Sequence, residues 1–387
     1  MGSAKFRAPC AYRSHWEQQM KNFALLAMLA VAAASQASVT AAPLGTWGFN
    51  GDGWWAPEEN GITYLTSTGS NQRSLTFNAA TGNVLINNGT GVSILNGSTG
   101  VRTGFFNMTG VTGGTFNFNQ VMATTDGQVF GTNLSASSTS GSPFKVYRWA
   151  NEAAGIAGTL SHTFSISTTT AARLGDASDI TGSGNSVSIV TGKGGSSPND
   201  LVGYYSFAFD GTNLTPTNNV VTGSGNGSFR LGIAYDTAGN VVGKQTGATA
   251  ATSPYRIANG STLSASWTPA SGGEHAVDFV SLNGFTLMAT VDANSNAVRI
   301  YDVTGLSGNQ TIAPILTLNN TTGAVNANGN AVGDIAFGAI TGNSVNLYAL
   351  NTNNGIQAFT ITAVPEPASM IALGAGLLAL ARRRRSK

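Results

Sequence analysis

Glu274 and His275 are the neighbouring residues of this sequence whose types best suit acid–base chemistry. A carboxylate beside an imidazole can move a proton near neutral pH. The pair directly precedes an alternating apolar run, so we expect it in a loop that leads into a strand. A solvated pair without a catalytic role fits that position equally, and we favour this interpretation. With only three histidines and one cysteine in 387 residues, no pattern typical of a metal-binding helix or a zinc site occurs.

Three aspartates, Asp179, Asp278 and Asp334, open similar apolar segments of the chain. Carboxylate oxygens are ligands that calcium prefers, so a ring of these residues could bind a cation. No Asp-x-Asp-x-Asp-Gly calcium loop is present, however. Aspartates at such positions also cap turns by accepting backbone N–H bonds. We favour capping, and we expect neither a metal nor another cofactor.

Trp54 and Trp55 lie close to Trp47 and Tyr64, among several acidic residues. Exposed aromatic rings beside carboxylates can stack on sugars and hydrogen-bond to them, so a glycan site is one interpretation. Large aromatic side chains also fill apolar junctions between sheets, and we favour that second interpretation.

The segment 192–195 reads Gly-Lys-Gly-Gly and resembles a phosphate-binding loop only superficially. It lacks the Gly-x-x-x-x-Gly-Lys-Ser/Thr pattern and the following helix that such a loop needs. We interpret it as a flexible loop.

The elements that must position these residues are short strands. Apolar alternations recur from about residue 44 to residue 362, and Gly-Asn, Asp-Gly or Asn-Gly turns separate them. The turn glycines recur every 45 to 58 residues, with third and sometimes fourth strands between them. This period is typical of propeller blades. The turn glycines are Gly82, Gly127, Gly184, Gly239, Gly284 and Gly342.

We therefore predict an all-β, β-propeller-like domain over residues 38–363 with six blades of antiparallel strands. One alternative is a seventh blade, built from residues 47–72 together with strands taken from other repeats. A β-sandwich or a parallel β-solenoid is the alternative fold. The last repeat ends near Thr362 with three strands, so an N-terminal strand should complete it. Residues 46–49 and 62–65 are the spare strands.

Charge excludes one class of partner for this domain. Between residues 38 and 363 there are ten lysines and arginines against fifteen aspartates and glutamates, a net charge of about −5. Nucleic-acid binding needs a basic face, and the composition offers none. A single cysteine also excludes an internal disulfide framework.

The N-terminal residues 1–37 have the pattern of a leader and signal peptide. Lys21 is followed by the apolar run 23–34 and by small residues around Ala37, as in a secretory signal that the Sec translocon reads. Met20 is the more natural start of this signal.

The C-terminal residues 364–387 have three parts. Val364-Pro365-Glu366-Pro367 is followed by an apolar run over 370–381 and by Arg382, Arg383, Arg384 and Arg385. Twelve helical residues span about 18 Å, against roughly 30 Å of hydrocarbon, so the run suits only a transient membrane anchor. The arginines would stay on the cytoplasmic side.

This tail resembles the PEP-CTERM sorting signal of Gram-negative bacteria. The resemblance implies processing by an exosortase-type membrane protease and sorting to the cell surface or an exopolysaccharide matrix. The body, through segments 142–151 and 351–359, resembles an uncharacterised family of exported bacterial domains with propeller-like repeats. That second resemblance implies a fold and a location, without an activity.

Two functions fit these features. The first is a non-enzymatic surface or matrix protein that binds polysaccharide or other exported proteins. The second is a secreted propeller enzyme acting on glycans, of the lyase or lactonase type. They differ in whether Glu274, His275 and the strand aspartates converge within hydrogen-bond reach.

Overall fold

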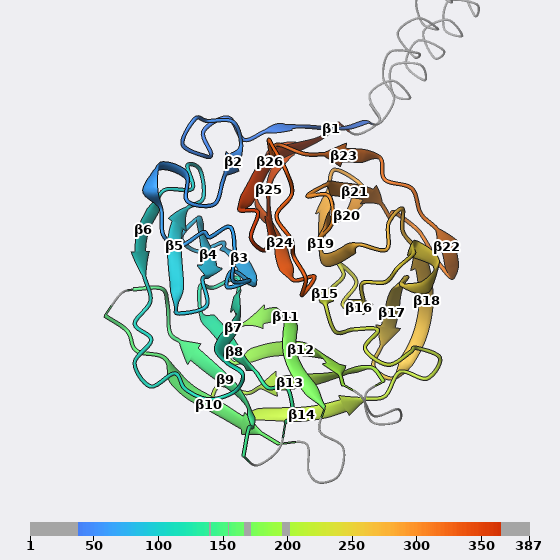
Figure 1. Cartoon of the computed structure of the whole chain (residues 1–387). Coiled ribbons are helices and arrows are strands. Elements are labelled where there is room, and N and C mark those ends of the chain that lie inside the picture. Colours follow the sequence, from blue (N-terminus) through green and yellow to red (C-terminus); the bar gives the residue numbers. More distant parts are fainter. Residues whose placement is uncertain (1–37, 139–140, 154, 166–171, 196–201, 365–387) are drawn as a thin grey trace, which may run out of the picture. The chain divides into compact units, whose positions relative to one another are not determined.

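A computed structural model describes residues 38–138, 141–153, 155–165, 172–195 and 202–364, and residues 40–362 form one compact unit. The predicted leader and the sorting segment beyond Val364 lie outside the described residues. Six small sheets surround a central axis, which Figure 1 views end-on. The prediction of an all-β propeller with six blades is confirmed.

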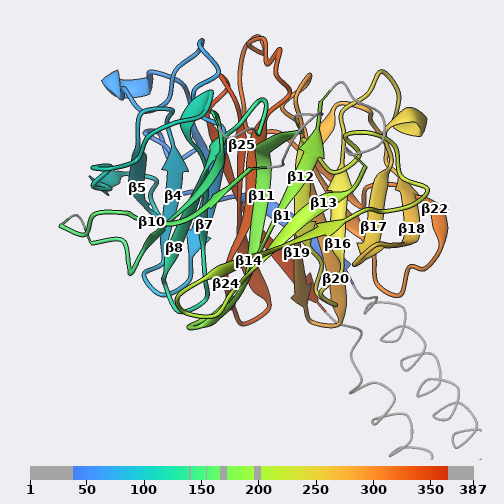
Figure 2. The ribbon, with the colours of Figure 1, turned by 90° about the horizontal axis from the view of Figure 1, so that it is seen from below.

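Each blade has its first strand innermost and its later strands progressively further out (Figures 1 and 2). Blade 1 consists of β3 (Ser74–Asn78), β4 (Asn83–Asn87), β5 (Val92–Asn96) and β6 (Arg102–Phe105). Blade 2 consists of β7 (Phe116–Ala123), β8 (Val129–Leu134), β9 (Phe144–Trp149) and β10 (Thr159–Phe164). Blade 3 consists of β11 (Arg173–Ser183), β12 (Ser186–Gly194), β13 (Tyr204–Phe209) and β14 (Leu214–Asn219).

The second half of the ring repeats this order with two additions. Blade 4 consists of β15 (Gly232–Tyr235), β16 (Val241–Lys244), β17 (Tyr255–Asn259) and β18 (Thr262–Thr268), with β22 (Asn309–Thr311) on its outer edge. Blade 5 consists of β19 (Glu274–Leu282), β20 (Phe285–Asp292), β21 (Val298–Asp302) and β23 (Leu316–Leu318). Blade 6 consists of β24 (Gly333–Thr341), β25 (Ser344–Asn351), β26 (Ile356–Val364) and β1 (Ser38–Pro43), and β2 (Trp54–Trp55) also pairs with β26.

The six predicted turn glycines lie between the first and second strands of the six blades. All six have a positive φ, between 59° and 88°. Glycine adopts this conformation without the steric cost that a side chain adds, so these turns are encoded locally. The sequence period therefore reports the blade period directly.

The core consists of layers between neighbouring blades. One layer packs Phe130 and Phe144 of blade 2 against Val187 and Phe207 of blade 3. Another packs Tyr255 of blade 4 against residues of blade 5. Alternate residues of each strand face the two neighbouring blades, which is why the strands show such regular alternation. A central channel runs along the axis, between the innermost strands.

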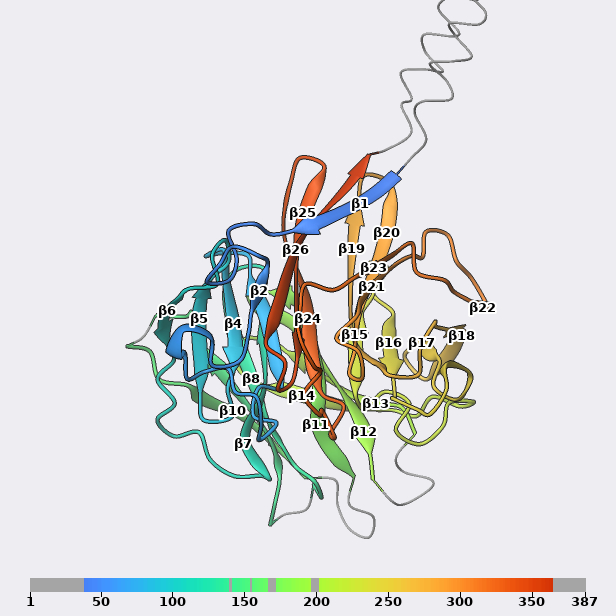
Figure 3. The same cartoon turned by 45° about the horizontal axis from the view of Figure 1, so that its top comes forward.

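The ring closes with a different segment from the one predicted. The outermost strand of blade 6 is β1, over residues 38–43, whereas residues 46–49 and 62–65 form no strand (Figure 3). Gly48 and Gly53 have φ of 87° and 82° and turn the chain at these points, which breaks an extended run. No seventh blade forms, because the described residues 47–72 contain only the two-residue β2 and a short 3₁₀ turn, Glu59–Gly61.

A second exchange between blades occurs on the outside of the ring. The fourth strand of blade 5, β23, covers only residues 316–318. The chain before it first adds β22 to blade 4, parallel to β18. The added strand covers an edge whose backbone groups would otherwise be unpaired and ties blades 4 and 5 together.

Candidate functional site

The three strand aspartates line the central channel. Asp179 accepts the backbone N–H of Tyr235 at 2.7 Å, and Asp278 accepts that of Phe337 at 2.7 Å. Asp334 accepts the backbone N–H of Leu75 at 3.1 Å. These residues do accept backbone N–H bonds, but each of these three bonds crosses to the next blade, so the prediction that they cap turns was wrong.

The channel around these aspartates is narrow. It holds a cavity of about 60 Å³, lined by all three of them and by apolar residues of the inner strands. That space suits a few water molecules and is much smaller than the pockets that hold small-molecule ligands. Within the described ranges, no group of three or more His, Cys, Asp or Glu side chains is arranged to hold a metal ion. The carboxylates thus connect blades.

Burial raises the pKa values of these carboxyls. The pKa of Asp179 is raised to about 6 and that of Asp278 to about 7, and the charge of Asp179 contributes to the second shift. The pKa of Asp334 lies well above its ordinary value for the same reason. The folded protein therefore keeps protons that the unfolded chain releases near pH 4.

This difference predicts a pH-dependent stability. The contribution is fully present below about pH 4 and is lost as the pH rises through about 7, because only the unfolded chain ionises freely in that window. Asp278→Asn keeps an oxygen for the Phe337 N–H and cannot ionise. Between about pH 5 and pH 8, the melting temperature of the wild type should therefore fall by at least about 2 °C more than that of Asp278→Asn.

The comparison of the two proteins also removes an opposing contribution. Burial lowers the pKa of His275 to about 4, so stability from this group is present at higher pH and is lost as the pH falls through about 6.5 toward 4. His275 is present in both proteins and its effect cancels in the difference. Identical pH profiles of the two proteins, followed by thermal unfolding, would contradict the assignment to Asp278.

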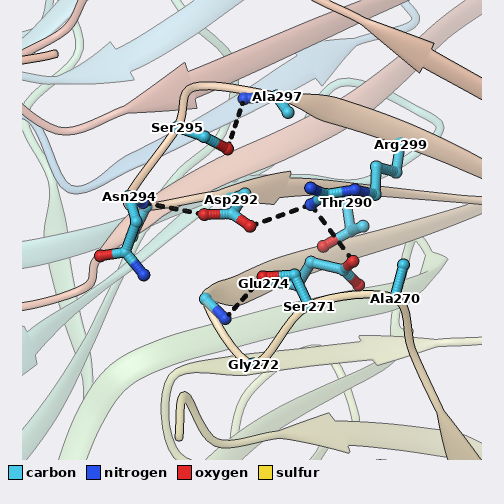
Figure 4. A network of polar contacts seen from close by, with 12 residues as sticks. Ala270, Ser271, Gly272, Glu274, Thr290, Asp292, Asn294, Ser295, Ala297 and Arg299 are labelled. Carbon is cyan, nitrogen blue, oxygen red and sulfur yellow. Dashed lines mark hydrogen bonds and ion pairs between the residues drawn. The ribbon is translucent and has the colours of Figure 1, made fainter. Parts of the chain in front are cut away.

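Glu274 lies at the start of β19 in a polar network between blades 4 and 5. Its carboxylate accepts hydrogen bonds from the hydroxyls of Tyr255 at 2.9 Å and Tyr301 at 2.8 Å. Arg299 bridges it to Asp292, with Nη1 at 3.3 Å from Glu274 and 2.9 Å from Asp292 (Figure 4). Both carboxylate oxygens of Glu274 are thus in use.

The network is balanced in charge and largely buried, with the side chain of Arg299 15% exposed. Lys244 and Arg299 oppose Glu274 and Asp292, and Lys244 Nζ also donates to Ser253 Oγ at 3.0 Å. Burial raises the pKa of Glu274, while the tyrosine hydroxyls and both cations lower it. Burial also lowers the pKa of Lys244 to about 8. Such a fully paired network is typical of a structural role, because each charge has a partner.

The predicted position of Glu274 and His275 in a solvated loop was wrong. Both residues are 0% exposed, and β19 begins at Glu274 itself. The inner strand of blade 4 lies so close that a Cβ on Gly232 would stand 1.6 Å from the carbonyl oxygen of His275. Within the described residues, no hydrogen bond joins the two side chains. Glu274 and His275 therefore do not form an acid–base pair with each other, and they do not join the channel aspartates in one site.

Trp54 and Trp55 do not present two free rings. Trp55 is buried and donates its indole N–H to the carbonyl oxygen of Thr99 at 3.0 Å. Trp54 is half-buried and donates to the carbonyl oxygen of Asn354 at 3.0 Å. Trp55 packs with Trp47 and Tyr348 in the layer between blades 6 and 1. Trp47 and Trp55 thus fill the junction where the ring closes, whereas Trp54 is not part of this packed layer.

Three arginines that were not predicted as site residues surround Asp176. Arg173 Nη2 lies 2.6 Å from one carboxylate oxygen of Asp176, and Arg230 Nε lies 3.0 Å from the other. Arg73 Nη2 reaches the first oxygen at 3.5 Å from blade 1. Arg73 directly precedes the inner strand β3, Arg173 begins β11, and Arg230 lies two residues before β15. We call this group the three-arginine cluster.

A sequence signal for the cluster exists. Arg-Leu-Gly occurs at 173–175 and again at 230–232, at the same point of two successive blades. The interpretation of segment 192–195 as a flexible loop was wrong, because residues 192–194 are the last residues of strand β12. This end of the strand lies beside the cluster. A Cβ on Gly194 would stand 2.2 Å from Cδ of Arg230, so glycine lets the arginine lie against the strand.

The C-terminal segment of the chain matches a known protein-sorting motif. Residues 363–385 match the model of the PEP-CTERM protein-sorting motif. The chain carries a PEP-CTERM sorting signal. This confirms the interpretation of Pro365-Glu366-Pro367 and the four arginines, and it implies an exported cell-surface protein that an exosortase processes. The Sec-dependent leader and the transient anchor stay predictions, and no helix in the described ranges has the length and apolar character needed to cross a bilayer.

The body of this PEP-CTERM protein is similar to a DUF4623 family protein from Bacteroides eggerthii. The TM-score is 0.59 and the identity 16%, over 86% of this chain and 77% of that chain. A glucose dehydrogenase has a TM-score of 0.43 and 10% identity over 76% of this chain and 96% of its own. A β-xylosidase has a TM-score of 0.35 and 9% identity over 61% and 87%. None of the curated proteins compared with the sequence matches it.

These similarities concern the fold alone. The TM-score of 0.59 to the DUF4623 family protein supports a shared architecture, and an identity of 16% transfers no activity or site to this chain. Among the ion pairs of the described residues, the three-arginine cluster has more positive than negative charges.

Proposed function

We propose that this exported protein is a non-catalytic component of the cell surface or extracellular matrix, whose propeller binds matrix polysaccharide or other exported proteins. The observation that carries the proposal is the PEP-CTERM signal joined to a rigid ring. The state of the candidate catalytic groups supports it. Glu274 is fully hydrogen-bonded in a buried network, and the aspartates are bonded to backbone N–H groups of neighbouring blades.

The alternative is a secreted enzyme acting on glycans. A general acid or base must come within hydrogen-bond reach of the group that it protonates or deprotonates. Glu274 has the raised pKa that such a role would use, but it is 0% exposed. The alternative therefore requires an opening between blades 4 and 5, and the proposed function does not.

Sorting is tested with a variant of the motif. Expressed in a Gram-negative host that has an exosortase, the wild type should lose its tail and reach the surface fraction. Glu366→Ala should accumulate as a longer, membrane-associated form, because the extended acidic peptide is the part that a protease at the membrane face can read. Immunoblots of cell fractions measure this, with Glu59→Ala as the matched control. Equal length and distribution of all three proteins would contradict the sorting step.

Binding is tested separately with the purified protein on a glycan array, with and without calcium. Selective retention of a matrix polysaccharide without cleavage supports the proposal. Release of shortened glycans would favour the enzyme, and Glu274→Gln would then be the first variant to assay. Absence of both glycan binding and association with co-exported proteins would overturn the proposed function.

A further inference from the structure

We propose that the three-arginine cluster binds a carboxylate or sulfate group of an acidic polysaccharide. This inference rests on the proposed function, since it names the site and the ligand class by which the exported propeller would hold a matrix polymer. Three arginines from blades 1, 3 and 4 share the single carboxylate of Asp176. Counted over the described residues, the cluster therefore carries an excess of two positive charges.

This excess is unusual for the molecule that contains it. The body has a net charge of about −5 and only ten cationic residues, of which three meet at this one point. The other buried ionic network, around Glu274, is neutral. A buried charge without a partner is costly, because the protein interior solvates it poorly. An external anion would supply the missing counter-charge.

The hydrogen bonds point to the same conclusion. Asp176 is bonded on both oxygens by Arg173, and the other two guanidinium groups approach it through one nitrogen each. A guanidinium group has five N–H donors, so Arg73 and Arg230 have donors to spare. Nε of Arg73 is buried and has no hydrogen-bond partner within the described part of the chain. Burial lowers the pKa of Arg73 to about 10; the charge of Asp176 opposes this shift, and the charges of Arg173 and Arg230 add to it.

The three arginine side chains differ in their exposure to solvent. The side chain of Arg73 is 1% exposed, and those of Arg173 and Arg230 are each 28% exposed. An anion can therefore contact the guanidinium groups of Arg173 and Arg230, while the charge of the buried Arg73 attracts it over a longer distance. The outer groups are held in place: Arg173 by two bonds to Asp176, and Arg230 by its packing on Gly194. The ring of Phe116 lies 4.8 Å from the guanidinium carbon of Arg73.

The geometry selects the class of ligand. Planar guanidinium groups bind carboxylate and sulfate oxygens through paired N–H bonds. Asp179 lies three residues further along β11, about 10 Å away, and the channel there is too narrow for a sugar ring. A polymer would therefore lie across the end of the channel and place only its anionic group on the arginines. Uronic acids carry such a carboxylate, and sulfated sugars carry the sulfate.

The test uses the purified protein and four polymers, namely polygalacturonate, dextran sulfate, neutral dextran and polyglutamate. Binding is measured by calorimetry at low and at high salt. We expect binding to one or both acidic polysaccharides and none to neutral dextran. Each of Arg173→Gln and Arg230→Gln should weaken it about 10-fold, and the double variant about 100-fold, because charge-assisted hydrogen bonds are lost. The loss should be smaller at high salt, where the charges are screened.

The matched control is Arg102→Gln, which removes an exposed arginine from the outer strand β6. It should change binding less than about 2-fold. Equal losses in the control and in the double variant would show a general charge effect and overturn the site. Absence of binding to both acidic polysaccharides would also overturn it. Binding of polyglutamate alone would assign the cluster to an acidic protein partner and overturn the polysaccharide.

A second measurement covers the case in which variants fold poorly. Asp176→Asn raises the excess charge, so sulfate or acetate should raise its melting temperature more than that of the wild type, relative to chloride at equal ionic strength. No such anion effect would contradict the site. If arrays show binding of neutral glycans that the arginine variants leave unchanged, the proposed function stands and this site fails. If no matrix component binds while sulfate still stabilises the protein, the proposed function and the polysaccharide fail, and only the anion site remains.

Discussion

Glu274→Ala is expected to lower the free energy of unfolding by about 3–5 kcal/mol, because it leaves buried partners without their carboxylate. Lys244 would keep only neutral hydrogen-bond partners and the more distant charge of Asp292. The hydroxyls of Tyr255 and Tyr301 would lose the acceptor that they share. Urea-induced unfolding, followed by intrinsic fluorescence, measures the loss.

Two controls separate this effect from a general loss of charge or volume. Asp210→Ala removes an exposed carboxylate that accepts two backbone N–H groups of its own turn, and it should destabilise the protein much less than Glu274→Ala does. The double variant Lys244→Met/Glu274→Gln removes both buried charges. It should be about 1–3 kcal/mol more stable than the sum of the single effects predicts. Simple additivity would contradict the view that unpaired charge causes the loss.

Trp47→Ala is expected to have a comparable effect, about 3–5 kcal/mol, because it empties the layer where blades 6 and 1 meet. Trp47 is 0% exposed, and its ring centroid lies 5.1 Å from that of Tyr348 on β25. A Cβ on Gly100 would stand 2.9 Å from the Trp47 ring, which shows how tightly blade 1 packs against it. The surroundings therefore have little freedom to fill the space.

The half-buried Trp54 provides the matched control for this prediction. Trp54→Ala removes the same type of side chain from β2, outside the buried layer, together with one indole hydrogen bond, and it should cost less than about 2 kcal/mol. Denaturant unfolding of the two variants under the same conditions gives the comparison. Equal losses would contradict the assignment of Trp47 as the residue that seals the ring.

The blades could be predicted from the sequence because their signals are local. A positive φ at Gly82 or Gly284 depends on a few neighbouring residues, and strict alternation on either side marks the paired strands. The strand that closes the ring could not be predicted in the same way. Residues 38–43 and 46–49 alternate about equally well, and the choice depends on pairing with β26 at the other end of the chain.

The candidate site shows the same limit more strongly. Arg73, Arg173 and Arg230 come from three blades, and only the closed ring brings them to Asp176. The repeated Arg-Leu-Gly is a sequence signal for Arg173 and Arg230 alone, and it is too short to indicate a site without the fold. Glu274 was predicted to be solvated because it directly precedes an alternating apolar run, where we expected a loop. Its burial depends on Tyr255, Tyr301 and Arg299, whose side chains the ring brings together at this point.

The strand pairing that closes blade 6 also affects when the protein can fold. Trp54, beside the first strands, donates its indole N–H to Asn354, 300 residues later. Contacts of such high contact order form slowly, because the entropy of joining distant segments is lost before their pairing compensates for it. Separate blades can collapse early, but the ring cannot be sealed until β26 is available to β1. The ring of this exported chain therefore stays incomplete through most of its synthesis. A translocation channel can still accept the chain in that state.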